Sequence, residues 1–398
     1  MNRRLLTTAG AVIVSGSLLL GACSSSDTNE GASKTTEAAK TNFDQAQAKK
    51  VVAHYADGVA ASYAASVASA KKLEASLKAF TASPSDATLS AAKDAWVAGR
   101  VDYRPTEAFR FYDGPIDEPE TGPEGRINAW PMDEAYVDYV QGADGVDWVG
   151  IINDPTNYPE ITKDVLVEAN EKDGEENIST GWHAIEFLLW GQDLSETGPG
   201  SRPFTDYTTA QNAERRAQYL TLLGEILVSD LQSVADAWTP DADNYRKTFV
   251  ADTNTAIAHI FRGIGALTVG ELSGERMAVA VETQDQEDEH SCFSDTTNGD
   301  VAGNIAGVKM VLDGAYPGGL SGPGLITLIG EADKTTAAEL TTQTAATLAE
   351  AENLPETFDQ LLANNTAALE AIIDGLTEQG KLIAQGAKKM GIEVDTGV

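Results

Sequence analysis

Apolar residues recur every three or four positions through most of this chain, and strict alternation of apolar and polar residues is scarce. One clear run has apolar side chains at four-residue intervals, at Val51, Tyr55, Val59, Tyr63 and Val67. This spacing places them on one face of an α-helix, whereas a half-buried strand would show a period of two. The pattern therefore predicts an all-α protein built from long amphipathic helices.

The predicted helices form two groups, each large enough for a helical bundle. The turn-rich TPDAD segment at 239–243 separates them. We therefore expect an N-terminal bundle domain over 43–240 and a C-terminal bundle domain over 241–398. Within them, Ser85 is expected to cap the second helix and Pro105 to interrupt it. Residues 268–295 are expected to be largely helical.

The N-terminus has the features of a bacterial lipoprotein signal. A positively charged MNRRLL start precedes a short apolar run, which ends in LGAC at Cys23. The run is too short for an ordinary transmembrane helix. We predict a signal peptide over 1–22, lipidation of Cys23 and a disordered tether over 23–42. The protein is then exported and anchored to a membrane, either the outer membrane facing the periplasm or the surface of a single-membrane cell.

The composition is strongly acidic. The chain carries 61 Asp and Glu against 28 Lys and Arg, a net charge of -33. Such a surface repels the phosphates of DNA and RNA, so nucleic acid is excluded as a partner. The charge suits a soluble exported surface, or attraction for cations. After removal of the signal peptide and lipidation of Cys23, only Cys292 is left, so we expect no internal disulfide bond.

The GWHAIEFLLWG segment at 181–191 places a histidine and a glutamate in an apolar helix. His183 and Glu186 are three residues apart, so both side chains can reach one atom. A carboxylate in such surroundings is costly unless it is paired or coordinated. The pair is a candidate for metal binding or for catalysis. The alternative is a hydrogen bond between the two side chains, with no ligand.

A second cluster lies in DQEDEHSCFSD at 285–295. Glu287 and His290 are again three apart, in the Glu-x-x-His order of helical di-iron proteins. Asp288 and Asp295 add oxygen atoms nearby. Together with His183 and Glu186 these residues suggest one mixed nitrogen and oxygen site, which suits iron, zinc or manganese. The alternative is a solvated acidic helix face.

Further polar residues are candidates for binding. Arg100, Tyr103 and Glu107 are spaced to share a helix face, which is either functional or simply exposed. Arg276 is a candidate buried partner for a site carboxylate. No His-Glu-x-x-His zinc motif is present, and His290 and Cys292 are wrongly spaced for a nucleophile pair on a helix.

These segments together resemble the imelysin family, also called peptidase family M75. Gly181, His183 and Glu186 match its Gly-x-His-x-x-Glu motif. Similar stretches are the run from Trp96 through Arg100, Tyr103 and Glu107, the DGPID and INAWPMDEAYVDY segments, and residues 274–297, which contain Arg276, Asp288, Ser291 and Asp295. The resemblance covers most of 43–395. It implies two domains that each resemble a four-helix bundle, with the functional site where they meet.

The resemblance also implies a function. Imelysin-like proteins are exported bacterial proteins, often lipoproteins, that are linked to iron uptake, and some have been described as proteases. We favour binding of a metal ion or metal chelate, with iron ahead of zinc, through His183, Glu186, Glu287 and His290, in concert with other iron-uptake proteins. One alternative is a metallopeptidase that uses His183 and Glu186 as catalytic residues. A second is a non-catalytic protein that binds a peptide or a partner, and haem stays open as a ligand.

Overall fold

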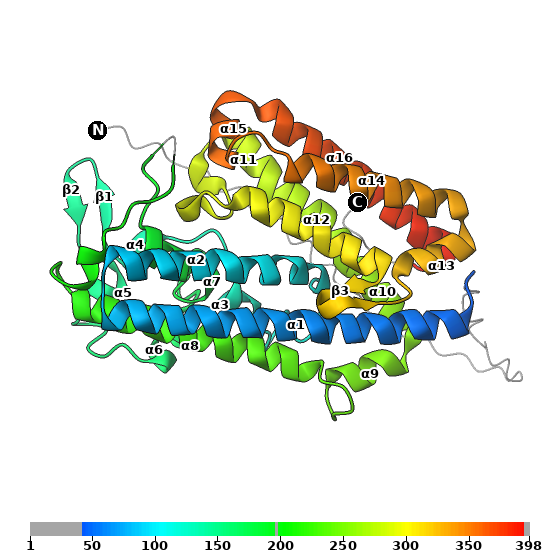
Figure 1. Cartoon of the computed structure of the whole chain (residues 1–398), viewed down its shortest axis with the longest axis horizontal. Coiled ribbons are helices and arrows are strands. Elements are labelled where there is room, and N and C mark those ends of the chain that lie inside the picture. The colour runs from blue at the N-terminus through cyan, green and yellow to red at the C-terminus, as the bar shows by residue number, and fades with distance from the viewer. Residues whose placement is uncertain (1–41, 196–197, 394–398) are drawn as a thin grey trace, which may run out of the picture. The chain divides into compact units, whose positions relative to one another are not determined.

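Helices account for most of residues 42–195 and 198–393, the part of the chain that the computed structural model describes (Figure 1). The all-α prediction is confirmed. The four short strands form two isolated antiparallel hairpins, β1–β2 and β3–β4. The predicted signal peptide, Cys23 and all of the predicted tether except Asn42 lie outside the described residues. No helix in the described ranges is both long and apolar enough to cross a membrane.

The elements follow one another as two long series. The first contains α1 (Gln45–Ala82), α2 (Asp86–Tyr103), the 3₁₀ helix η1 (Arg104–Phe109), α3 (Glu124–Ile127), α4 (Glu134–Val137), β1 (Val140–Gly142), β2 (Gly145–Asp147), α5 (Gly150–Asn153), α6 (Lys163–Ala169), α7 (Gly181–Trp190), η2 (Phe204–Tyr207) and α8 (Ala213–Ala237).

The second series contains α9 (Tyr245–Ala251), α10 (Thr253–Ala266), the π-helix η3 (Leu267–Ala278), α11 (Val279–Thr283), η4 (Gln286–Asp288), η5 (Cys292–Ser294), α12 (Thr297–Asp313), β3 (Ala315–Tyr316), η6 (Pro317–Gly319), β4 (Leu320–Ser321), α13 (Leu325–Ala332), α14 (Lys334–Glu352), α15 (Phe358–Asn364) and α16 (Thr366–Met390).

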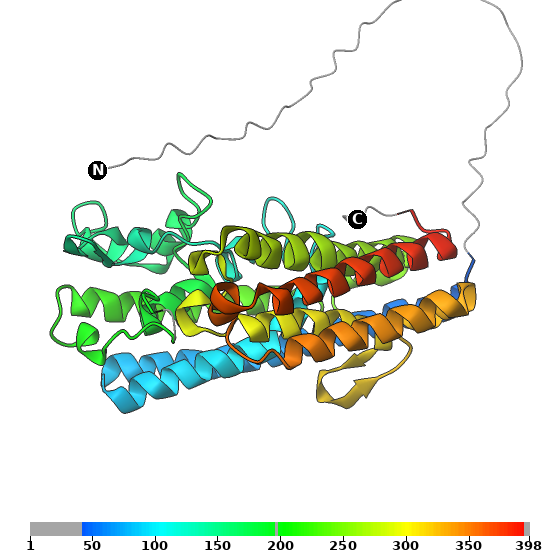
Figure 2. The same cartoon turned by 90° about the horizontal axis from the view of Figure 1, so that it is seen from above.

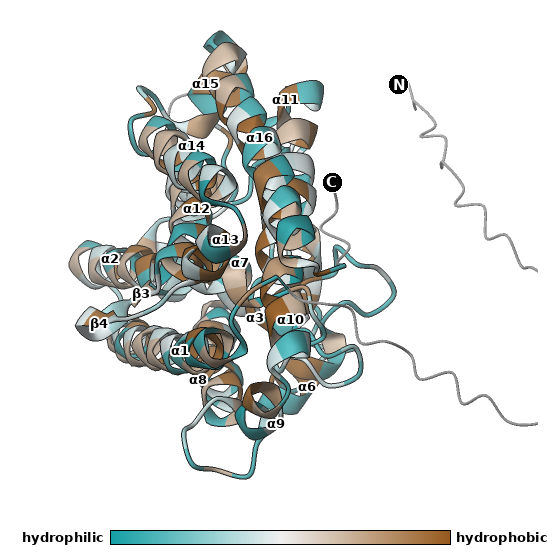
Figure 3. Ribbon diagram, turned by 90° about the vertical axis from the view of Figure 1, so that its right-hand side faces the viewer, coloured by the Kyte–Doolittle hydropathy of each residue, from teal (hydrophilic) through white to brown (hydrophobic). Residues whose placement is uncertain are grey.

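The long helix α1 contacts elements of both series. It packs along α2 and α8 and also touches α9, α10 and α13 (Figure 1). In the second series α14 and α16 run side by side, as Figure 2 shows, and α16 also packs on η3. Each long helix carries hydrophilic and hydrophobic residues, which Figure 3 shows nearly end-on.

The described residues belong to one compact unit with a large core and a smaller one. The large core draws side chains from both series, from Phe43 to Met390. The smaller core draws only on the second series, from Leu272 to Leu376. The boundary near residue 240 therefore stays a prediction about subdivision within this unit.

Local signals set the ends of the early helices. Ser85 caps α2 through a capping box with Thr88, as predicted, so backbone N–H groups at the helix start are satisfied. Pro105 lacks a backbone N–H, and α2 gives way there to the tighter η1.

The helix predicted over 268–295 is wrong after Thr283, where α11 ends. Gln284 adopts a left-handed conformation with φ 55°, and only the short 3₁₀ turns η4 and η5 follow. The acidic run explains this, because like charges one turn apart destabilise a helix. The Asp285 side chain instead accepts the backbone N–H of Glu287.

Glycines let η1 approach α12 closely. A side chain at Gly299 or Gly303 would collide with Arg104, and one at Gly307 would collide with the Pro105 backbone. These three glycines are four residues apart, so they form one bare stripe on α12. The stripe allows η1 to lie against α12. It thereby brings Arg104 of η1 within reach of Asp300, which belongs to α12 like the glycines.

Candidate functional site

The Gly-x-His-x-x-Glu motif begins α7, a helix in which every residue is buried. It packs against α2, α3, α8 and η5. Gly181 has φ +88°, and a side chain there would place its Cβ 2.6 Å from the carbonyl oxygen of Ile127. Only glycine tolerates both conditions. The glycine therefore fixes the start of the helix, and with it the positions of His183 and Glu186.

His183 and Glu186 are hydrogen-bonded, with 2.9 Å between Nδ1 and Oε2. The other carboxyl oxygen of Glu186 accepts from the Ser294 backbone N–H at 3.0 Å and from its hydroxyl at 2.6 Å. Burial raises the pKa of Glu186 to about 8, although the Ser294 hydrogen bonds oppose this. The carboxyl is therefore harder to ionise than an ordinary glutamate, and both of its oxygens are engaged.

His290 lies directly against His183, as the shared-site hypothesis required. Their ring centroids are 4.6 Å apart, and the Nε2 atoms of both rings have no hydrogen-bond partner. Burial, together with neighbouring positive groups, lowers the pKa of His183 well below 6.5 and that of His290 to about 4. Both imidazoles are therefore neutral at pH 7, the form that binds metal ions.

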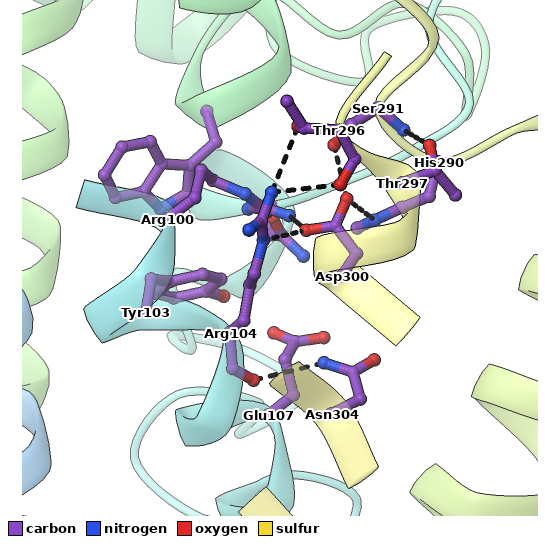
Figure 4. Close-up of polar contacts among 12 residues, drawn as sticks. Arg100, Tyr103, Arg104, Glu107, His290, Ser291, Thr296, Thr297, Asp300 and Asn304 are labelled. Carbon is purple, nitrogen blue, oxygen red and sulfur yellow. Dashed lines mark hydrogen bonds and ion pairs between the residues drawn. The ribbon is translucent and has the colours of Figure 1, made fainter. Parts of the chain in front are cut away.

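A buried carboxylate, Asp300, holds this region together (Figure 4). It pairs with Arg100 at 2.7 Å and Arg104 at 2.5 Å, and it accepts a hydrogen bond from Ser291. Both arginines are on Oδ1, whereas Ser291 is on Oδ2, and His290 Nδ1 lies 3.3 Å from that same Oδ2. Burial alone would raise the pKa of Asp300, but the two arginines hold it well below 3.8. Asp300 is thus a permanent anion beside the Nδ1 edge of His290.

The predicted polar face of Arg100, Tyr103 and Glu107 is not exposed, since all three are buried. Arg100 lies 5.4 Å from the Tyr103 ring centroid. Glu107 pairs with Arg276 at 2.6 Å and Arg110 at 3.0 Å. Burial opposes ionisation of Glu107, but these arginines lower its pKa to about 2. Arg276 is therefore a buried partner of the Glu107 carboxylate, which agrees with the prediction that it pairs with a carboxylate of the site.

An acidic pocket of about 500 Å³ reaches this region from outside. His290 and Trp130 line it, and Arg110 and Arg276 stand in its wall. The remaining charged lining residues are acidic: Glu124, Glu171, Glu175, Glu271, Glu275 and Asp288. The Trp130 ring centroid is 5.0 Å from that of His183, which itself is fully buried. Trp130 and His290 thus lie between the pocket and His183.

Two predicted site residues lie apart from the histidine pair. Glu287 belongs to η4, is exposed, and its carboxyl is hydrogen-bonded to Glu134. Asp295 follows η5 and faces other carboxylates. Within 42–195 and 198–393, no three His, Cys, Asp or Glu side chains are already arranged to hold a metal ion.

Several residues of this region escaped the sequence analysis. Asp300 and Ser294 carried no motif, because their partners lie about 200 and 108 residues away. Arg104 had a usable signal, since it is one helical turn after Arg100. Trp130 was within the INAWPMDEAYVDY segment, but nothing there pointed to His183.

The fold and site belong to a recognisable class of protein. The family model for imelysin, Peptidase M75, matches residues 59–383. The chain therefore belongs to the imelysin family.

Individual relatives agree with this. The chain is 24% identical over 317 residues to Iron-regulated protein A of Synechococcus elongatus, which covers 77% of this chain and 75% of that protein. A crystal structure described as a candidate iron-regulated protein A precursor from Parabacteroides distasonis has a TM-score of 0.69 at 19% identity, covering 89% of this chain and 97% of that one. An imelysin-like protein from Psychrobacter arcticum has a TM-score of 0.66 at 17% identity, covering 89% and 99%. Both crystal structures share the fold of this chain.

We predict that Asp300→Asn destabilises the protein by about 3–5 kcal/mol, because it leaves two buried arginines without their counter-charge. Asp313→Asn, on the same helix, removes a partly exposed pair with Lys309 and should change stability by less than about 1 kcal/mol. Urea unfolding of both variants measures the difference. Equal effects would show that Asp300 does not hold the site together.

We predict that the free energy of unfolding of the metal-free protein declines as pH falls from about 6.5 to about 4, and that protonation of His290 in the unfolded chain contributes to this decline. The unfolded chain binds a proton to this histidine across that window while the folded protein does not, so acid favours unfolding. The loss attributable to His290 is on the order of 3 kcal/mol. Unfolding free energies across this range should show a shallower slope for His290→Gln.

Proposed function

We propose that this imelysin-family protein binds a metal ion, with iron first and zinc second, at His183 and His290, and that it serves iron acquisition. The observation that carries the proposal is the pair of buried, neutral imidazoles in ring contact whose Nε2 atoms have no partner. Buried polar groups are normally hydrogen-bonded, so two such atoms side by side point to an additional ligand.

The surrounding residues fit the role of supports for metal ligands. A histidine that binds metal commonly has its other ring nitrogen held by a carboxyl group. Glu186 holds His183 Nδ1 in this way, and Asp300 lies beside His290 Nδ1. Because both Glu186 oxygens are engaged, we assign this residue to orienting His183. Glu287, paired with Glu134, is not needed in this arrangement.

The acidic pocket supports a cationic ligand. Its lining carries six carboxyl groups against two arginines, and the whole chain has a net charge of -33. A concave acidic surface raises the local concentration of cations. Two imidazoles leave most of the metal coordination sphere to water or to a ligand that the metal brings with it, and the pocket has room for either.

The relatives support the physiological part of the proposal. The curated relative carries the name Iron-regulated protein A, which describes regulation by iron. The family model is that of a peptidase family, so proteolysis is the competing activity that an experiment must separate.

We predict that the purified protein binds ferrous, ferric or zinc ions and that His183→Ala and His290→Ala each weaken binding at least tenfold. Glu186→Gln should weaken it by roughly 10–100-fold, as expected for a residue that orients a ligand. Calorimetry and elemental analysis provide the measurement. His259→Ala is the matched control, because this histidine stacks on Tyr112 elsewhere in the core.

The same samples, incubated with casein, decide between the two activities. If the protein binds metal without cleaving casein, and if His183→Ala and His290→Ala lose this binding, the result supports iron binding. Metal-dependent cleavage that disappears in His183→Ala would replace it with a peptidase function. No binding of any of the three ions would sink the proposal and favour a partner protein or a haem as the ligand.

We also propose that the protein is exported and held at a membrane by a lipid on Cys23, which is supported by the LGAC segment. Cys23→Ala should abolish incorporation of radiolabelled fatty acid and release the protein from the membrane fraction. Cys292→Ala is the matched control and should be labelled normally. An unlabelled wild-type protein would contradict the anchor.

A further inference from the structure

The acidic pocket that leads to His290 changes character along its depth. Three of its lining carboxylates are exposed to solvent and stand at its mouth: Glu171, Glu175 and Glu275. The buried members of its lining are of another kind: Arg110, Asn128, Arg276 and His290. The pocket therefore presents negative charge at its mouth and side chains that carry N–H groups at its inner end.

Two of the buried donors have no acceptor. Asn128 is 2% exposed; its Oδ1 accepts from Arg100, but its Nδ2 has no hydrogen-bond partner. Arg110 is 8% exposed; its Nη1 pairs with Glu107 and Glu124 at 3.0 Å each, but its Nε–H has no acceptor. Both groups can only donate, and buried donors are normally satisfied. We therefore look for an acceptor that the described residues do not supply.

These donors lie close to the histidine pair. Arg100 donates from one nitrogen to Asn128 and from another to Asp300 at 2.7 Å. Asp300 in turn lies 3.3 Å from His290 Nδ1. Asn128 and His290 are thus connected through two residues, and both line the same pocket. One small ligand can therefore contact both.

One wall of the pocket belongs to the π-helix η3. Consecutive residues of this helix provide Glu275 at the mouth and Arg276 at the inner end. Arg276 is held there by Glu107 and Glu271, each at 2.6 Å. Because π-helical turns are rare and occur frequently at functional sites, the wall itself agrees with a ligand in this pocket.

A carboxylate is the acceptor that best matches the two donors. It has two oxygen atoms that accept several hydrogen bonds at once, and a guanidinium N–H binds it more strongly than it binds a neutral carbonyl group. The pocket volume of about 500 Å³ lies within the range of small-molecule sites, roughly 300–1,000 Å³. A small organic acid therefore fits both the donors and the space.

We propose that the acidic pocket binds a small organic carboxylate through Asn128 and Arg110, and that this carboxylate arrives as the chelate of a metal ion. The carboxylate contact depends on the two unpartnered donors. The metal part rests on the proposed function, because it assigns the ion to His183 and His290. The chelator then supplies ligands that two imidazoles leave missing from the coordination sphere.

The mouth of the pocket favours the metal-loaded form of such a ligand. Glu171, Glu175 and Glu275 repel a free carboxylate, whereas a bound metal ion cancels part or all of the negative charge of its chelator. Discrimination between two ligands commonly depends on repulsion of the wrong one. The donors at the inner end thus recognise the carboxylate, and the acidic mouth selects the chelate over the free acid.

Calorimetry of the purified full-length protein at pH 7.5 tests the proposal with three probes. They are ferric citrate, metal-free citrate, and zinc chloride as an ion without a chelator. We expect ferric citrate to bind more tightly than metal-free citrate by about tenfold or more, a difference of roughly 1.4 kcal/mol. Zinc should bind without citrate, because the two histidines hold it.

Asn128→Asp separates the carboxylate contact from the metal site. The variant keeps Oδ1 for Arg100 but replaces the donor by a negatively charged oxygen, so ferric citrate should bind about tenfold more weakly or worse. Zinc should bind as tightly as before or more tightly, because the new charge attracts a cation. Arg110→Lys keeps the charge beside Glu107 and Glu124 but loses the Nε donor. It should also weaken ferric citrate binding and leave zinc binding unchanged.

A variant at the mouth tests the selection of the chelate. Glu275→Gln should strengthen binding of metal-free citrate and change that of ferric citrate less, which narrows the difference between the two. The matched control is Glu339→Gln, at an exposed carboxylate of α14 that does not line the pocket, and it should change neither affinity.

Ferric citrate binding that is unchanged in both Asn128→Asp and Arg110→Lys would overturn the carboxylate contact and leave the histidine site standing. Equal loss of ferric citrate and zinc in both variants would also overturn it, because the variants would then have damaged the metal site. Citrate binding that depends on Asn128, in a protein that binds no zinc and gains nothing from iron, would support the carboxylate contact. That result would overturn the chelate and count against the proposed metal function.

Discussion

The buried ion pairs of Asp300 with Arg100 and Arg104 are the interaction on which the candidate site depends. They join α2 and η1, from the first series of helices, to α12 in the second. Removing two arginines and a carboxylate from water is expensive, and only their close mutual contact offsets that cost. Because Asp300 also binds Ser291 and lies beside His290, the same carboxylate sets the position of the loop that carries the second histidine.

Glycine makes this contact geometrically possible. The bare stripe on α12 lets η1 come close, and Gly181 lets α7 begin against the Ile127 carbonyl group. His183 on α7 and His290 on the loop then meet inside the protein. Neutral imidazoles result because the interior is desolvated and the nearby arginines disfavour a further positive charge.

The protein treats its buried carboxylates in two ways. Asp138, Glu107 and Asp300 have arginine partners and lowered pKa values, so they act as fixed anions. Glu186 is instead held by His183 and Ser294, and burial raises its pKa to about 8. Glu186 lies next to the histidines, where ligand binding is proposed.

The sequence by itself determined the all-α class, the cap at Ser85 and the break at Pro105, and it singled out His183, Glu186 and His290 as candidate site residues. These features depend on spacing within a few residues, which periodicity and capping rules describe. It did not determine the end of α11, the burial of Arg100 and Glu107, or the pairing of Glu287 with Glu134.

Only the tertiary structure decided which distant groups meet. Asp300 pairs with arginines about 200 residues away in the chain, and Ser294 bonds to Glu186 across 108 residues. Such pairings follow from how helices pack and from charge balance in a desolvated interior. Neither leaves a local pattern in the sequence, because the energy of a buried charge depends on what surrounds it in space.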